Sequence, residues 1–145
     1  LLGYDMQMSL NAAEPRSGAF DSPRHGFLVA AAGPAFTALQ ALAAFVLIRR
    51  MGLLLAYPVL FGACFMRFAA LVVSVSHPND EARMSMHLGW NMWVLPMLMV
   101  ACLFVLTWAG SRRLSVGWRA NLASYLICSA VCASIVLADL RFTGS

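Results

Sequence analysis

Residues 26–48 read GFLVAAAGPAFTALQALAAFVLI, a run of 23 residues without a charged side chain. As an α-helix this run would be about 35 Å long, which is enough to cross the roughly 30 Å hydrocarbon core of a bilayer. It is too long for the apolar region of a signal peptide, and Arg49 and Arg50 follow it instead of a cleavage site. The run therefore predicts a transmembrane helix.

The composition of the whole chain agrees with a membrane protein. Of its 145 residues, 61% are hydrophobic and 11% are charged, and the mean hydropathy is +0.77. An average soluble domain is about half apolar and about one quarter charged. The composition therefore excludes a disordered tail, a disulfide scaffold and an ordinary cytosolic enzyme, and predicts one integral membrane domain over residues 1–145.

Further apolar runs predict three more transmembrane helices. The fold class expected is all-α integral membrane, with four transmembrane helices and a short β-like, interfacial N-terminal segment at residues 1–25. The β-like character comes from residues 4–11, where apolar and polar side chains alternate with a period of two. Residues 14–18 read as a turn. The four expected spans are approximately residues 26–48, 51–76, 89–109 and 120–138.

The arginines suggest an orientation and exclude one class of partner. The first and third connections together hold five arginines and the other side holds four, so we expect these two connections in the cytoplasm. Either orientation places the segment before Gly26 and the second connection on one face. The ten basic residues are all arginine and form no cluster, which argues against nucleic-acid binding. We expect a multi-pass protein of a cell membrane, the bacterial inner membrane.

The second connection, residues 77–89, reads HPNDEARMSMHLG. Asn79 followed by two acidic residues predicts the start of a short helix, and Gly89 predicts its end. Asp80 and His87 are seven residues apart and so about 20° apart around such a helix, with Arg83 between them. Asp80 can alternatively form a surface ion pair with Arg83. Two histidines and one aspartate are too few to fix a catalytic metal, which normally takes three protein ligands.

The first span and the second span each contain a polar feature. Gly33 and Pro34 predict a kink, and Thr37 and Gln40 place hydrogen-bonding groups about one turn beyond it. Packing and an active site explain that pattern equally well. Arg67 either extends toward the lipid headgroups or faces the bundle and holds an acid of the second connection. A stripe of small residues for close helix packing is expected at Ala31, Ala35 and Ala38.

Two segments together resemble a known family. AAGPAFT at residues 31–37, preceded by LGYDMQMSLN at residues 2–11, resembles the site-2 protease class of zinc intramembrane metallopeptidases. In that class an HExxH helix is followed by a Leu-Gly-type turn and strands, then by a helix with a Gly-Pro motif, and later by an aspartate that is the third zinc ligand. The segment Asn79–Ala82 lies where that aspartate is expected. The resemblance covers roughly residues 1–90.

The resemblance implies a chemistry and a role for several residues. It implies zinc as cofactor, peptide hydrolysis in or near the membrane, and Asp80 as third metal ligand. Thr37 and Gln40 would orient the substrate backbone, and Arg83 or His87 would support the metal site. HExxH itself is absent from this sequence. The resemblance implies that it lies just before Leu1, and a chain that begins without methionine fits a cut at that point. We therefore expect no catalytic residue within this chain.

A second function class stays open beside the peptidase. The chain could be a non-catalytic relative, or a structural subunit that packs against a larger membrane complex. Its partners would be membrane lipid and either a membrane-protein substrate or that larger complex. A small transporter would show paired intramembrane polar residues or an internal repeat, and the sequence has neither.

Overall fold

The computed structural model describes residues 6–8, 13–15, 22–75 and 78–143. Most of them are helical. The elements, in chain order, are β1 (Met6–Met8), β2 (Ala13–Pro15), α1 (Pro23–Met51), the 3₁₀-helix η1 (Leu54–Ala56), α2 (Tyr57–Val73), α3 (Asp80–His87), α4 (Val94–Arg113) and α5 (Trp118–Thr143).

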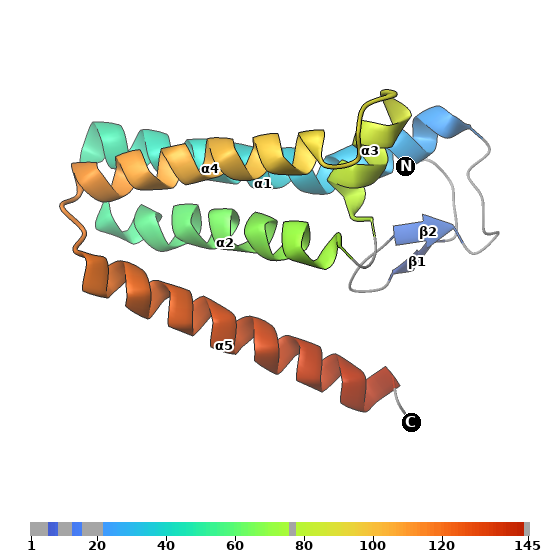
Figure 1. The fold of residues 1–145 in the computed structure, drawn as a ribbon. Coiled ribbons are helices and arrows are strands. Elements are labelled where there is room, and N and C mark those ends of the chain that lie inside the picture. The colour runs from blue at the N-terminus through green and yellow to red at the C-terminus, as the bar shows by residue number, and fades with distance from the viewer. Residues whose placement is uncertain (1–5, 9–12, 16–21, 76–77, 144–145) are drawn as a thin grey trace.

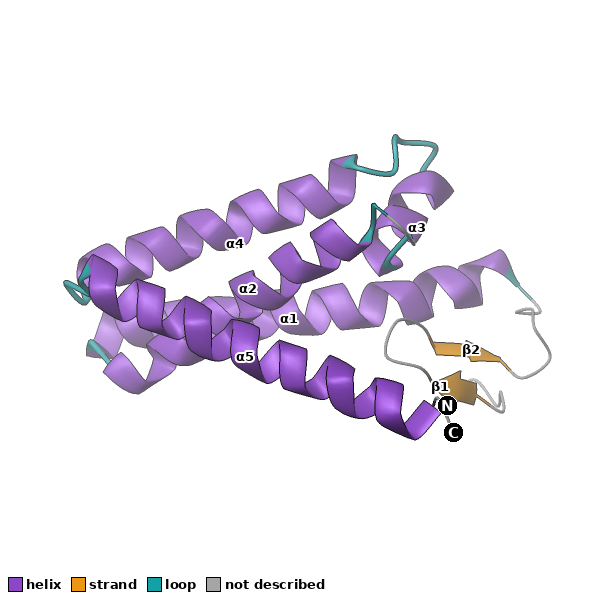
Figure 2. Ribbon diagram, turned by 60° about the horizontal axis from the view of Figure 1, so that its bottom comes forward, coloured by secondary structure: helices purple, strands orange, loops and turns teal. Residues whose placement is uncertain are grey.

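The long helices α1, α2 and α4 lie side by side, and the short helix α3 packs at one end of this bundle (Figure 1). Helix α5 begins at the opposite end beside α2 and angles away from the bundle along its length (Figures 1 and 2). Both views place β1 and β2 at the end that holds α3. The N-terminal strands and the second connection therefore share one end, as the topology predicts.

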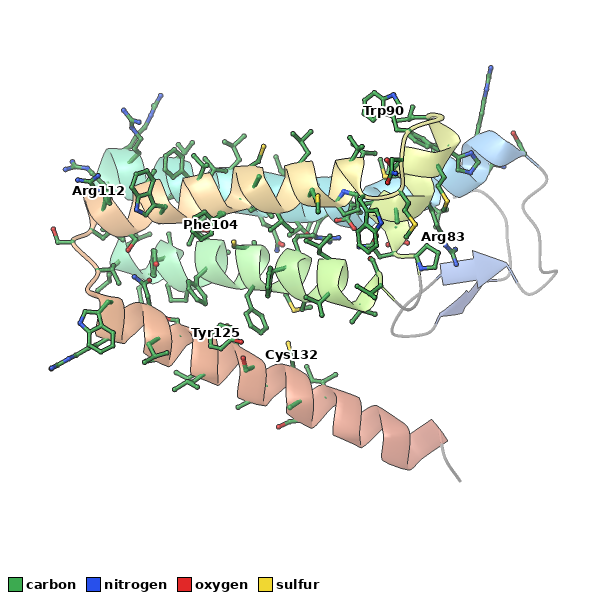
Figure 3. The ribbon with its side chains drawn as sticks, viewed as in Figure 1. Arg83, Trp90, Phe104, Arg112, Tyr125 and Cys132 are labelled. Carbon is green, nitrogen blue, oxygen red and sulfur yellow. The ribbon has the colours of Figure 1, made fainter. Side chains whose placement is uncertain are left out.

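Three described helices are long and apolar enough to cross a membrane: Arg24–Met51, Leu54–Val73 and Val94–Arg113. Large apolar side chains cover their outer faces. Leu39 is 65% exposed, Leu55 is 80% exposed and Phe104 is 64% exposed, and Figure 3 shows such side chains pointing away from the bundle. A water-soluble surface rarely presents apolar area on this scale, so the chain is membrane-embedded.

Local sequence signals explain where α1 begins and ends. The Ser22 hydroxyl accepts a hydrogen bond from the Arg24 amide at 3.3 Å, and Pro23 occupies the first turn, where a missing N–H does no harm. At the other end Gly52 adopts φ 63° and its amide donates to the Ile48 carbonyl at 3.0 Å. A left-handed residue at this position is a common helix terminator, and glycine adopts it without strain.

The packed face of α1 differs from the predicted one. The stripe expected at Ala31, Ala35 and Ala38 is wrong, since Ala35 is exposed and the other two are half-buried. The residues that precede Ala31 and Ala35, namely Ala30 and Pro34, are buried instead. The reason is that α1 carries alanine on several faces, so small size alone does not select the face that packs. The buried residues of α1 are Ala30, Pro34, Ala41, Ala44 and Ile48.

The bundle core lies between α1, α2 and α4, where Leu60 and Leu103 are almost completely buried. Helix α4 approaches α2 closely at Gly110. A β-carbon added to Gly110 would stand 2.9 Å from a methyl carbon of Leu60, which is closer than real contacts of this kind. Small residues let membrane helices pack this tightly, and van der Waals contact then stabilises them.

Helix α3 forms where the sequence predicts it. The Asn79 side chain accepts a hydrogen bond from the Ala82 amide at 2.9 Å, which caps the first turn. Asp80 and Glu81 in that turn are favoured by the positive end of the helix dipole. Gly89, with φ 73°, follows the helix and reverses the chain.

Several boundaries differ from the sequence prediction. Helix α4 starts at Val94 instead of residue 89, because the Asn91 side chain accepts from the Trp93 amide at 3.1 Å and holds a turn there. Helix α2 ends at Val73, short of residue 76. Helix α1 starts at Pro23, three residues before the predicted 26.

The N-terminal segment contains the short antiparallel pair β1–β2, with Gln7 opposite Glu14. The turn predicted over residues 14–18 is therefore wrong at Glu14 and Pro15, which belong to β2. The remainder of that turn, and most of the alternating run at residues 4–11, lie outside the described residues.

Helix α5 is fastened to the bundle near its start. Asn121 accepts a hydrogen bond from the Tyr57 hydroxyl and donates one to the Ser111 hydroxyl at 3.2 Å. One turn further on, the Tyr125 ring packs edge-on against Phe65, with ring centres 5.7 Å apart. This polar link between α2, α4 and α5 was not predicted, since Asn121 at the head of an apolar run resembles a simple helix-end residue.

Candidate functional site

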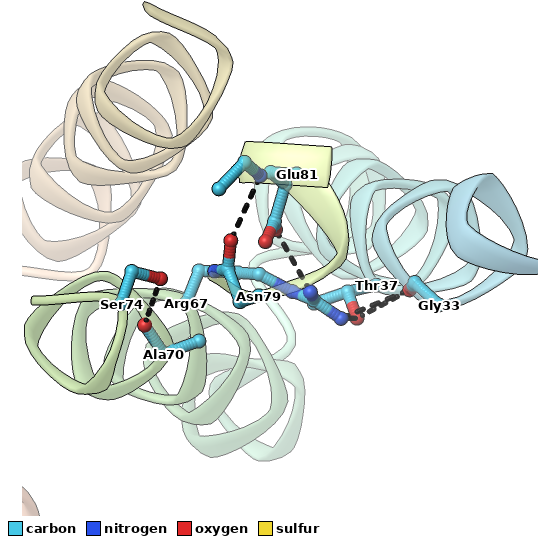
Figure 4. A network of polar contacts seen from close by, with 8 residues as sticks. Gly33, Thr37, Arg67, Ala70, Ser74, Asn79 and Glu81 are labelled. Atoms are coloured by element: carbon cyan, nitrogen blue, oxygen red, sulfur yellow. Dashed lines mark hydrogen bonds and ion pairs between the residues drawn. The ribbon is translucent and has the colours of Figure 1, made fainter. Parts of the chain in front are cut away.

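Arg67 is the centre of a polar network inside the end of the bundle that holds α3 (Figure 4). Its Nη1 atom lies 2.8 Å from Oε1 of Glu81, and the two side chains are 15% and 5% exposed. An ionised side chain at such a place is costly unless it is paired. The ion pair therefore ties α3 to α2, and Arg67 faces the bundle rather than the lipid headgroups.

Helix α1 completes the coordination of Arg67. Nη2 of Arg67 donates to the Gly33 carbonyl at 3.0 Å and to the Thr37 hydroxyl at 2.5 Å. The Thr37 hydroxyl in turn donates to the same Gly33 carbonyl at 2.9 Å. The Gly-Pro segment that the sequence singles out thus supplies one backbone oxygen to the guanidinium, beside the buried ring of Pro34.

The network also contains buried polar atoms that no described residue satisfies. These are Nε of Arg67, Oε2 of Glu81 and Nδ2 of Asn79. Each unpaired buried group of this kind costs about 1–3 kcal/mol. The site therefore places charge and hydrogen-bonding capacity where apolar packing alone would be more stable, and such an arrangement is typical of functional sites.

Asp80, the first residue of α3, is half-buried beside this network. A β-carbon placed on Gly33 would lie 3.6 Å from Oδ2 of Asp80, so the missing glycine side chain leaves room for the carboxylate. Burial raises the pKa of Asp80, and the neighbouring negative charge of Glu81 raises it further. The positive charges of Arg83 and Arg67 partly oppose that rise in pKa. No described residue makes a hydrogen bond or an ion pair with the Asp80 carboxylate.

The other predicted site residues divide into two groups. Gly33, Pro34 and Thr37 lie at the network together with Asp80, whereas Gln40 is exposed on α1 and is not among the residues that hydrogen-bond to Arg67. Arg83 and His87 on α3 are exposed as well, and His77 lies outside the described residues. The structure therefore places the Gly-Pro segment of α1 and Asp80 together at the Arg67 network, and Gln40 lies outside it.

His87 packs elsewhere, against the first turns of α1. Its ring packs edge-on against the Phe27 ring, with ring centres 6.3 Å apart. Both rings line a cavity of about 420 Å³. That cavity is also lined by Arg24, Leu28 and Leu88. The 20° separation that the sequence predicts between Asp80 and His87 does not bring them to one site, because α3 is two turns long and its ends meet different parts of α1.

Glu81 is the residue that sequence reasoning missed. The sequence has two adjacent acids in the second connection and one charged residue in the second span, and it predicts a bond between Arg67 and one of these acids as one of two alternatives. Adjacent residues of a helix point about 100° apart. Only the rotation of α3 decides that Glu81 turns inward to Arg67 while Asp80 turns toward α1.

The described residues do not by themselves form a zinc site. No group of three or more His, Cys, Asp or Glu side chains comes together in the described part of the chain. At the network Glu81 is engaged by Arg67, which leaves Asp80 as the available carboxylate. A catalytic zinc ion takes three protein ligands, so this set is two ligands short.

Comparison with known proteins finds no matching family model, no similar curated sequence and no similar solved structure.

Proposed function

We propose that the chain is a site-2 protease-like membrane metallopeptidase, or its C-terminal portion, which hydrolyses peptide bonds in or near the membrane. The observation that carries the proposal is the position of Asp80. Its carboxylate is half-buried at the end of a membrane bundle, lies against the Gly-Pro segment of α1, and is not held by any described side chain. A membrane protein seldom places a carboxylate there without a use for it.

The surroundings of Asp80 favour a ligand role. Glu81, the next residue, is locked to Arg67, and Asn79, the preceding one, caps the helix, so the backbone at Asp80 is fixed on both sides. A metal ligand requires this kind of support, because imprecise positioning lowers metal affinity. We propose Asp80 as the one ligand that these residues contribute to a zinc ion. The remaining ligands would be the two histidines of an HExxH helix outside this sequence.

The proposal extends to topology and location. We propose that α5 is a fourth membrane-spanning helix, since residues 120–138 carry no charge and α5 covers all of them. We also propose a bacterial inner membrane, with the first and third connections in the cytoplasm. The excess of arginine at those connections supports this orientation.

Metal analysis of the full-length protein tests the ligand role. We expect about one zinc ion per chain in the wild type. Loss of a residue that only supports a metal ligand typically lowers metal affinity by ~10–100-fold. Asp80→Ala removes a proposed ligand, so we expect its zinc affinity to fall by at least that factor. Asp139→Ala is the matched control, because it removes an aspartate that belongs to another helix, α5. Unchanged zinc content in Asp80→Ala would remove Asp80 from the site.

A second candidate function, a structural subunit of a larger membrane complex, is favoured by the outer surface of α5. Beyond its contacts with α2 and α4, this helix exposes Leu126, Ile127, Val131 and Ile135. A full-length protein that contains no zinc and no HExxH motif, and that purifies as part of a larger assembly, would establish the subunit and contradict the peptidase.

A further inference from the structure

The end of the bundle opposite α3 holds a second cavity of about 500 Å³ between α1 and α4. Three arginine side chains line it, Arg49 from α1 and Arg112 and Arg113 from α4, and its remaining wall is apolar, formed by Phe45 and Ala109. Figure 3 shows Arg112 at this end of the molecule and Arg83 at the other. The cavity is thus basic on one side and apolar on the other.

Acidic side chains of the described residues do not balance the positive charge at this end of the bundle. Helices α1 and α4 both finish here with two arginines in the last turn. The two helix C-termini together carry about one negative charge, roughly one half each. The sequence has no acidic residue between Asp21 and Asp80, or between Glu81 and Asp139. Among the described residues no carboxylate pairs with these arginines, so about three positive charges are left over to attract an anion.

The neighbouring face of α4 places the cavity at the level of lipid headgroups. The guanidinium of Arg112 lies over the indole of Trp108, 5.4 Å from the ring centre. Tryptophan gathers at the boundary between headgroups and hydrocarbon. Phe104, one turn further into the membrane on the same face, is 64% exposed. Arg112, Trp108 and Phe104 therefore follow one line, from a charged end to an apolar one.

We propose that this cavity binds the phosphate headgroup of an anionic glycerophospholipid, with an acyl chain along the Trp108–Phe104 face of α4. Guanidinium groups match phosphate oxygens with paired N–H donors, and three arginine side chains line this cavity. The apolar wall and the exposed apolar face favour a phosphate that carries an acyl chain over a free one. The site lies at the opposite end from Asp80 and does not depend on the proposed peptidase function.

Quenching of Trp108 fluorescence measures the binding. The full-length protein, with every tryptophan except Trp108 changed to phenylalanine (in this sequence Trp90, Trp93 and Trp118), is placed in nanodiscs of phosphatidylcholine with increasing phosphatidylglycerol. Bromine on the acyl chains of either lipid then reports its contact with Trp108. We expect phosphatidylglycerol to be preferred by ~5-fold or more, since each arginine near a membrane surface contributes about that factor.

Arg49→Gln and Arg50→Gln form a matched pair for this measurement. Both remove one charge from the last turn of α1, but Arg49 lines the cavity and Arg50 does not. We expect Arg49→Gln to lower the preference by ~5-fold and Arg50→Gln to leave it nearly unchanged. The unfolding temperature of each variant verifies that it is folded.

Three results would overturn the proposal. Equal quenching by the two lipids would mean that no anionic headgroup is selected. An equal loss of phosphatidylglycerol preference in Arg49→Gln and Arg50→Gln would mean that the preference comes from the overall positive charge of this end and not from the cavity. Restoration of Trp108 emission by millimolar glycerol 3-phosphate would assign the cavity to a soluble phosphate instead of a lipid.

Discussion

The two ends of the bundle use arginine in opposite ways. At the α3 end Arg67 is buried, paired with Glu81 and bonded to the α1 backbone. At the other end Arg49 and Arg112 are exposed and have no acidic partner among the described residues. A buried charge must be satisfied by the protein itself, whereas an exposed one remains available to an outside ligand.

This difference assigns different tasks to the two ends. The α3 end holds α1, α2 and α3 together by polar contacts, and so it can position Asp80. The arginine end is held together by apolar packing around Leu60 and Gly110 and by the hydrogen bonds of Asn121. These contacts do not include an ion pair of its arginines.

The largest expected effect is on the buried ion pair. Arg67→Leu leaves Glu81 buried without its partner, and we expect it to destabilise the protein by about 3–5 kcal/mol. Arg50→Leu replaces an exposed arginine at the other end, and it should change the free energy of unfolding little. Thermal unfolding of the purified protein in detergent compares the two.

A double variant verifies the cause of that loss. If the unpaired charge of Glu81 is responsible, adding Glu81→Gln to Arg67→Leu should recover part of the stability, so that the two losses are not additive. Equal stability of Arg67→Leu and Arg50→Leu would mean that Arg67 extends to the headgroups and that the two ends do not differ.

The next effect concerns the apolar contact that holds the arginine end. Gly110→Ala puts a methyl group 2.9 Å from Leu60, which is fully buried and cannot move freely. We expect a loss of about 1–3 kcal/mol from overpacking. Gly62→Ala on α2 is the control, since a β-carbon there meets nothing within 4 Å and alanine favours the helix. A Gly110→Ala protein as stable as Gly62→Ala would show that α4 does not pack tightly here.

Sequence reasoning succeeds where the signal is local. Apolar runs locate the three helices that are apolar enough to cross a membrane, and the Asn79 and Gly89 signals locate α3, because composition and capping depend on neighbouring residues. The fourth span stays a prediction. The start of α4 is mispredicted because Trp90 and Trp93 count as apolar while Asn91 between them forms a turn.

The rest depends on how helices rotate against each other, which local patterns do not determine. Alanine occurs on several faces of α1, so the sequence does not reveal that Ala41 and Ala44 are the packed ones. Likewise the choice between Asp80 and Glu81 as the partner of Arg67 needs the rotation of α3. The Tyr57–Asn121 link joins residues 64 positions apart, a separation at which no local pattern applies.

The smallest effect is the pH dependence of stability that Asp80 confers, measured as unfolding temperature against pH with a metal chelator present. Burial raises the pKa of Asp80 in the folded protein above its value in the unfolded chain. Between these two pKa values the folded state binds more protons, so stability falls as pH rises through that window. Asp80→Asn lacks this titration.

The unfolding temperature of the wild type should therefore fall relative to that of Asp80→Asn as pH rises through the window. Above and below the window the difference between the two proteins should be constant. Arg83→Gln sharpens the measurement, because loss of a positive charge that lowers the pKa of Asp80 should extend the window to higher pH. A shift in the opposite direction would mean that nearby arginines hold Asp80 as a stable carboxylate. The charges at the α3 end would then all be compensated within the protein, and Asp80 would no longer be available as a ligand.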